Sequence, residues 1–195
     1  PSTIMPGELT ASHIDSVGLS CPGARIIAMG TDGRELPSGE IGELWIRSAS
    51  VIKGYWNNPK ATAESFTAGF WHSGDLGSVD AANFVRVFDR QKDMINRGGL
   101  KIYSAEVESV LAGHPAVVES AIIAKPCPVL GERVHAVIVT RAEVDADSLR
   151  AWCAERLSDY KVPETMALTA QPLPRNANGK VIKRQLRESL TAAKA

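Results

Sequence analysis

One charged, glycine-containing stretch, residues 89–108 (DRQKDMINRGGLKIYSAEVE), constrains the fold of this chain more than any other. Residues 84–88 (FVRVF) precede it and alternate apolar and polar side chains, which predicts a strand. Inside the stretch, Gly98–Gly99 frees the backbone either for positive φ or for close approach of a ligand. Ser104 is the expected N-cap of a following helix, which Gly113 ends. The stretch therefore predicts a hinge, then a loop, then the start of a helix.

Short strands and turns occupy the chain before this stretch. Residues 24–29 and 43–47 are predicted strands, and Asp32–Gly33 between them is a hairpin-turn signal. Asn58 is expected to cap a short helix over residues 59–66, because Pro59 suits the first helical position. This pattern of short strands and turns predicts a small β-barrel or sandwich.

The chain after the stretch mixes helix and strand signals. Residues 117–124 and 133–140 are apolar, β-branched runs that predict neighbouring strands, linked by a loop at 126–132. Asp145 or Asp147 is expected to cap a helix, and residues 165–169 form a third predicted strand. The second half is therefore expected to be a compact mixed domain, and the fold class of the whole chain is α+β.

Composition narrows the class of protein. Hydrophobic residues make up 44% and charged residues 23% of the chain, and the formal net charge is zero, so neither nucleic acid nor a membrane surface is an expected partner. No apolar run approaches the ~18 residues of a membrane span. Cys21, Cys127 and Cys153 are odd in number and far apart, which favours reduced thiols and a cytoplasmic location. The four histidines are scattered, so no metal site is expected.

Residues 89–108 resemble the hinge motif of the acyl-activating, adenylate-forming enzymes, which include acyl-CoA synthetases, peptide-synthetase adenylation domains and firefly-type luciferases. Four further motifs at family spacing extend the resemblance over about residues 18–190: GELW with GYW, of structural character; WHSGDL; LSDYKVP; and PRNANGK. The resemblance implies that residues 1–88 are the β-barrel end of a larger, incomplete N-terminal AMP-binding domain. Residues 89–195 would be the complete, mobile C-terminal domain. Because the chain opens on Pro1 without an initiator methionine, we expect a fragment.

The resemblance assigns a nucleotide site to Asp75 and Arg90. A carboxylate can accept hydrogen bonds from both hydroxyls of a ribose, and Asp75 after the flexible Gly74 offers one at an expected strand end. Arg90 matches the second ribose and phosphate contact; its alternative role is a surface ion pair with Asp89 or Asp93.

The same resemblance places a pivot at Lys92 and the passage for the CoA thiol at Gly98 and Gly99. It also places a catalytic lysine at Lys180, on a turn made by Asn178–Gly179. This turn is not a phosphate-binding P-loop, which needs other residues around its Gly-Lys pair. The structural alternative is an exposed hairpin lysine.

The function implied is that of the C-terminal part of an acyl-CoA synthetase, which joins a fatty or aromatic acid to CoA through an acyl adenylate. ATP/AMP, CoA and Mg²⁺ are the implied cofactors and substrates, with the Mg²⁺ ligand upstream of Pro1, so the chain alone is expected to be inactive. The expected partner is the missing N-terminal domain. Further possible partners are a second copy of the chain, in a homo-oligomer, and a lysine acetyltransferase that acts on Lys180. Two alternatives are an adenylating enzyme that delivers the acyl group to a carrier protein and a noncatalytic binding module that keeps the fold. These 195 residues do not identify the acid.

Overall fold

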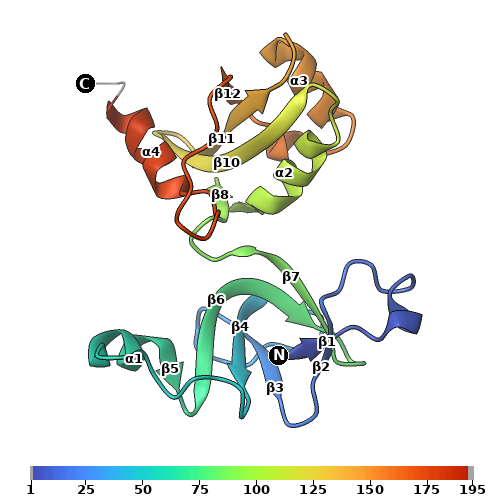
Figure 1. Cartoon of the computed structure of the whole chain (residues 1–195), viewed down its shortest axis with the longest axis vertical. Helices are drawn as coiled ribbons and strands as arrows, with labels where there is room; N and C mark the ends of the chain where they lie inside the picture. Colours follow the sequence, from blue (N-terminus) through green and yellow to red (C-terminus); the bar gives the residue numbers. More distant parts are fainter. Residues whose placement is uncertain (1, 193–195) are drawn as a thin grey trace. The chain divides into compact units, whose positions relative to one another are not determined.

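The computed structural model describes residues 2–192 and divides the chain into two compact units, Pro1–Lys92 (unit 1) and Asp93–Ala195 (unit 2). Each unit has its own sheet and its own buried apolar clusters. The fold is therefore mixed α and β, as the sequence predicts, and the two units are described separately (Figure 1).

Unit 1 consists of one seven-stranded sheet with a single short α-helix. Its elements are β1 (Thr3–Ile4), the 3-10 turn η1 (Gly7–Leu9), β2 (Gly18–Ser20), β3 (Arg25–Met29), β4 (Gly42–Arg47), α1 (Pro59–Ser65), β5 (Phe66–Thr67), β6 (Phe70–Val79) and β7 (Phe84–Arg90). The strand order is β1-β2-β7-β6-β4-β3, all neighbours are antiparallel, and β5 pairs with β6.

The expected β-barrel is not closed. Within residues 2–192, the end strands β1 and β3 do not pair with each other, so the sheet is open. Closing a sheet needs a row of backbone donors and acceptors on both edge strands, and β1 offers only two residues. The predicted start of the short helix is confirmed. The Asn58 side chain caps α1 by accepting a hydrogen bond from the Ala61 amide at 3.0 Å, and Pro59 is the first helical residue. The helix ends at Ser65, because Phe66 already belongs to β5.

Both faces of the unit 1 sheet bury apolar side chains. Ile26, Ala28, Leu44 and Val85 form one buried cluster, with Ile46 packed against it. Ile27, Met29 and Phe70 form a second cluster with Trp45. Neighbouring residues of a strand point to opposite faces, so β3 and β4 each contribute side chains to both clusters. In the same sheet, β6 lies between β4 and β7.

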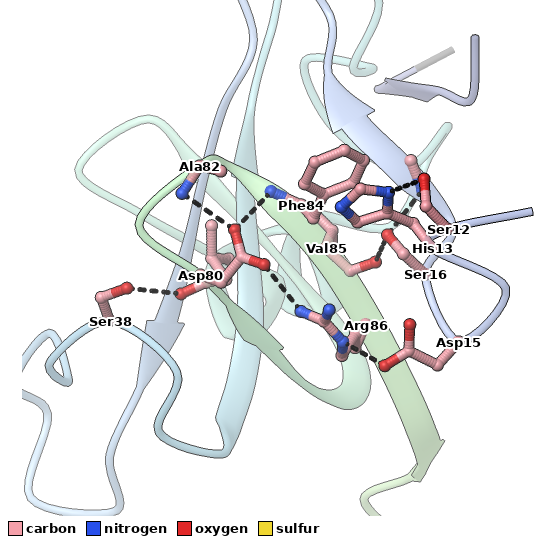
Figure 2. A network of polar contacts seen from close by, with 12 residues as sticks. Ser12, His13, Asp15, Ser16, Ser38, Asp80, Ala82, Phe84, Val85 and Arg86 are labelled. Carbon is pink, nitrogen blue, oxygen red and sulfur yellow. Dashed lines mark hydrogen bonds and ion pairs between the residues drawn. The ribbon is translucent and has the colours of Figure 1, made fainter. Parts of the chain in front are cut away.

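A polar network attaches the N-terminal loop to β7 (Figure 2). The Arg86 guanidinium donates to Asp80 at 2.9 Å and to Asp15 at 2.5 Å, and the His13 ring stacks on Phe84 with ring centroids 3.7 Å apart. The hydrogen bond from Arg86 holds the pKa of both carboxyls below their usual values. The loop therefore braces the strand whose other end carries Arg90.

Unit 2 is a five-stranded sheet with helices on both faces. Its elements are β8 (Ile95–Arg97), β9 (Leu100–Ile102), α2 (Ser104–Ala112), β10 (Val117–Cys127), β11 (Gly131–Thr140), α3 (Ala146–Ala154), the 3-10 turn η2 (Asp159–Lys161), β12 (Thr165–Thr169) and α4 (Lys183–Ala192). β10 and β11 form an antiparallel hairpin, and β12 runs parallel to β11 on its other side. The hairpin strands extend well into the predicted loop at 126–132, because Pro126 and Cys127 still pair with Glu132 and Gly131.

The core of unit 2 has two parts, one on each face of the sheet. α2 and α3 cover the larger cluster, which includes Val107, Leu111, Leu149 and Cys153, while α4 covers a smaller one through Leu186 (Figure 1). Burial raises the pKa of the Cys153 thiol. All three cysteines are free, as the sequence predicts, and no helix among residues 2–192 is long and apolar enough to span a membrane.

Two predicted helix caps had different outcomes. Asp145 is the N-cap of α3 and accepts from the Ser148 amide at 2.7 Å, as predicted. The prediction for Ser104 was wrong: Tyr103 occupies the N-cap position of α2, and Ser104 is its first residue. The Ser104 side chain is fully buried, and its hydroxyl accepts a 2.6 Å hydrogen bond from the Lys183 ammonium of α4. Ser104 thus ties two helices together.

Candidate functional site

Asp75 and Arg90 face each other across neighbouring strands of unit 1. They are register partners of β6 and β7, and the Arg90 Nε lies 2.8 Å from the Asp75 Oδ1. Asp75 lies inside β6 rather than at the predicted strand end, one residue before a register shift between Leu76 and Gly77. The two side chains are 28% and 49% exposed, so each retains surface for a ligand. A carboxylate and a guanidinium so paired can receive the hydroxyls of a sugar and the oxygens of a phosphate.

The backbone that carries Asp75 is held by contacts that sequence analysis did not anticipate. Gly74 adopts a φ of 71°, its amide donates to Glu43 Oε1 at 3.1 Å, and its carbonyl accepts from the Gln91 amide at 2.8 Å. The other oxygen of Glu43 accepts from the Trp45 indole at 2.9 Å. The GELW motif therefore has an identifiable structural role: its glutamate, Glu43, supports the backbone next to Asp75.

The predicted pivot lies at the division between the two units. Lys92 is exposed and is the last residue of unit 1, and Asp93 opens unit 2. Two residues earlier, the Arg90 amide donates to the Asp89 carboxylate at 2.8 Å, which holds the end of β7 in place. Lys92 therefore lies two residues after the end of β7, at the division between the two units.

Gly98 and Gly99 form the two-residue turn of the β8–β9 hairpin. Their φ values are 57° and 92°, and the type I′ form of such a turn requires positive φ at both central positions. A Cβ on Gly98 would lie 3.2 Å from Leu130 Cδ2, whereas a Cβ on Gly99 would meet no atom within 4 Å. Of the two reasons for glycine that the sequence left open, positive φ is the one that the hairpin requires at both residues.

Lys180 follows a tight turn in which the whole segment Arg175–Lys180 is exposed. The Gly179 amide donates to the Asn176 carbonyl at 2.9 Å, so Ala177 and Asn178 are the central residues of the turn, and Gly179 follows them with a φ of 79°. The predicted turn is present, but Asn178–Gly179 is not its central pair. Among residues 2–192, the Lys180 ammonium has no ion pair or hydrogen bond in the structure. A lysine so presented is a free positive charge on a projecting turn.

The predicted residues thus fall into two sets. Asp75, Arg90 and Lys92 belong to unit 1, while Gly98–Gly99 and Lys180 belong to unit 2. Within residues 2–192 there is no group of three or more His, Cys, Asp or Glu side chains that could hold a metal ion.

Comparison with known proteins gives one family model within unit 2 and relatives that match both units. The family model "AMP-binding enzyme C-terminal domain" matches residues 106–180, which lie within unit 2. Feruloyl-CoA synthase of an Amycolatopsis species is 41% identical over 91% of this chain and 36% of its own length. The long-chain-fatty-acid–CoA ligase FadD13 of Mycobacterium tuberculosis is 37% identical over 97% of this chain and 38% of its own length.

A solved structure agrees with these relatives. The o-succinylbenzoate CoA synthetase (MenE) of Bacillus subtilis, solved with an acyl-adenylate intermediate, superposes with a TM-score of 0.90 at 35% identity. The match covers 95% of this chain and 38% of that protein. The fold and the matched motifs define an adenylate-forming type of protein. The chain belongs to the AMP-binding acyl-CoA ligase family, whose C-terminal part it matches, and it spans less than two-fifths of the length of these relatives.

Proposed function

We propose that this chain is the C-terminal part of an ATP-dependent ligase that joins a fatty or aromatic carboxylic acid to CoA. In this proposal residues 1–88 close a larger AMP-binding domain and residues 89–195 form the mobile C-terminal domain. The observation that carries the proposal is the similarity of nearly the whole chain to two ligases, one named for feruloyl-CoA and one for long-chain fatty acyl-CoA.

The first half-reaction is adenylation. A carboxylate oxygen of the acid attacks the α-phosphorus of ATP, the bond from that phosphorus to the bridging oxygen breaks, and pyrophosphate leaves. Asp75 would accept hydrogen bonds from the ribose hydroxyls, and Arg90 would contact the ribose and a phosphate oxygen. Lys180 would place its ammonium beside the oxygens that gain negative charge, which stabilises the transition state more than the ground state. Its unpaired state in the structure supports this role.

Magnesium would supply charge neutralisation at the phosphates of ATP. The o-succinylbenzoate CoA synthetase of Bacillus subtilis has been solved with ATP and a magnesium ion. In this proposal the ligand for that ion lies upstream of Pro1, as the family resemblance implies.

The second half-reaction forms the thioester. The CoA sulfur attacks the acyl carbonyl, the bond from the acyl carbon to the phosphate oxygen breaks, and AMP leaves. We assign the pivot for a domain rotation to Lys92, so that Lys180 moves away from the bound nucleotide and the hairpin with Gly98 and Gly99 approaches it. The open space around Gly99 supports passage of the narrow pantetheine arm beside this turn.

A pyrophosphate-release assay on the full-length protein tests the proposal. The panel should contain cinnamic-type aromatic acids and saturated fatty acids of graded length, and CoA esters should be identified by mass spectrometry. We expect CoA-dependent thioester formation with at least one acid. Acyl adenylate without a CoA ester would favour the alternative, delivery to a carrier protein. Absence of pyrophosphate release with every acid would favour a binding module that keeps the fold.

A further inference from the structure

The turn that presents Lys180 has almost no packing of its own. Arg175 to Lys180 are all exposed, and a Cβ added to Gly179 would meet no atom within 4 Å. Apolar contacts anchor only the two flanks of the turn, where Leu173 is buried and Val181 packs against the same small cluster. Polar contacts must therefore hold the tip of the turn in one conformation.

Glu119 of β10 supports the incoming side of this turn. Its Oε1 accepts a hydrogen bond from the Leu173 amide at 2.9 Å, and its Oε2 pairs with a terminal nitrogen of Arg175. The Glu119 side chain is 19% exposed and lies on β10, an edge strand of the unit 2 sheet. Arg175 is thus connected to the rigid sheet rather than only to its own loop.

Arg175 continues this connection to the residue before Lys180. Its second terminal nitrogen donates to the Gly179 carbonyl at 2.6 Å. One guanidinium therefore bridges a sheet carboxylate and the peptide group that leads into Lys180. The planar fork of arginine can hold two acceptors at once, which a single ammonium does not do with the same geometry.

Asn176 completes the support from inside the turn. Its side-chain oxygen accepts from the Lys180 amide at 3.0 Å, and its own amide donates to the Lys180 carbonyl at 2.9 Å. On the outgoing side, the Lys183 ammonium lies 2.7 Å from Glu108 of α2. Both flanks of the turn are tied to the body of unit 2, and Arg175 is the contact that reaches its tip.

We propose that Arg175, held by Glu119, is a positioning residue that fixes the turn from which Lys180 acts in adenylation. The proposal deepens the assignment of Lys180 and rests on the proposed function. Its physical basis is preorganisation: a charge placed in advance costs no ordering at the moment of reaction, and a displacement of about 1 Å can reduce a rate about 10²-fold.

The pair is a poor candidate for a merely structural contact. Arg175 is 45% exposed, and ion pairs that reach solvent contribute little to stability. The buried residues beside the turn do not depend on it, since Leu173 and Leu186 remain in their apolar cluster. Replacing Arg175 should therefore loosen the turn and leave unit 2 folded.

The first experiment uses the 195-residue chain and does not depend on any activity. Backbone ¹⁵N relaxation should be measured for Gly179 and Lys180 in the wild type, Arg175→Gln and Arg150→Gln. Arg150 is the matched control, because it also pairs with an acid in unit 2, on α3. We expect order parameters near the rigid value of about 0.85 in the wild type and control, and below about 0.6 in Arg175→Gln. Unchanged order in Arg175→Gln would overturn the proposal.

The second experiment measures both half-reactions in the full-length ligase. Arg175→Gln should lower the kcat of adenylation by about 10- to 100-fold, with KM for ATP and acid unchanged. Thioester formation from preformed acyl adenylate should stay at the wild-type rate. Arg175→Lys keeps the charge but not the bridge, so it should restore little of the loss. Full rescue by lysine, equal loss of both half-reactions, or unchanged adenylation would each overturn the positioning role.

The two experiments separate this proposal from the proposed function. If Lys180→Ala keeps full adenylation, the role of Lys180 is wrong, while the relaxation data still decide whether Arg175 orders the turn. If Lys180→Ala abolishes adenylation and Arg175→Gln leaves it intact, only the positioning role is wrong.

Discussion

His135 couples the stability of unit 2 to pH in a way that can be measured directly. Its side chain is 4% exposed on β11, and its Nδ1 lies 2.7 Å from the Thr165 hydroxyl of β12. Its Nε2 is buried without a hydrogen-bond partner among residues 2–192. Burial, with a smaller contribution from the charge of Lys125, lowers the pKa of His135 from 6.5 to about 4. The folded unit therefore keeps this imidazole neutral where an unfolded chain would protonate it.

The sign and size of the effect follow from this pKa difference. Between pH 6.5 and pH 4 the unfolded chain binds more protons at His135 than the folded unit, so stability falls as pH decreases. From pH 7.5 to pH 5 the expected loss is roughly 2 kcal/mol, and it approaches roughly 3 kcal/mol at lower pH, at about 1.4 kcal/mol per pKa unit. The stabilisation is fully present above pH 6.5.

Urea unfolding of the 195-residue chain checks this expectation. Native amide signals of β11 in two-dimensional NMR report on unit 2 alone, and linear extrapolation at pH 7.5 and pH 5 gives its stability at each pH. His135→Gln should remove most of the difference between the two pH values. His114→Gln, which removes another histidine of unit 2 and keeps His135, should retain it. An equal acid loss in His135→Gln and wild type would refute the reasoning.

Four further predictions concern the proposed reaction. Lys180→Ala in the full-length ligase should lower adenylation by about 10²- to 10³-fold and nearly spare thioester formation from preformed acyl adenylate; parallel loss in both assays would contradict its role. Lys92→Pro, which fixes φ near −65°, should make acyl adenylate at the wild-type rate and lose CoA ester formation, while Lys92→Ala keeps both. Gly99→Leu should lose CoA ester formation relative to Gly99→Ala, because both variants carry the same strain at a φ of 92° and only leucine obstructs a pantetheine arm; equal rates would argue against a passage there. The 195-residue chain alone should catalyse no ATP–pyrophosphate exchange, and exchange that scales with its concentration would disprove this.

Local chemistry allowed much of the fold to be predicted from the sequence. Asn58, Pro59 and Asp145 mark helix starts because their side chains act within a few residues of their own position. Gly98, Gly99 and Gly179 mark turns for the same reason, since the positive φ that each one adopts belongs to the residue itself. The motifs that indicate the family are likewise short runs with fixed spacing, and the comparisons confirm the family.

Contacts between distant segments could be decided only by the tertiary structure. Arg90 pairs with Asp75 because the register of β6 on β7, which includes a shift that no local pattern encodes, makes these two residues neighbours. Ser104 is not the predicted cap of α2; its hydroxyl instead accepts a hydrogen bond from Lys183, which lies 79 residues later. The bridge from Glu119 through Arg175 to the Lys180 turn likewise depends on packing of that segment beside β10. The strand order of unit 1, and the fact that its sheet stays open, also depend on pairing between residues that are far apart in the sequence. The free energy of that pairing cannot be read from any single segment.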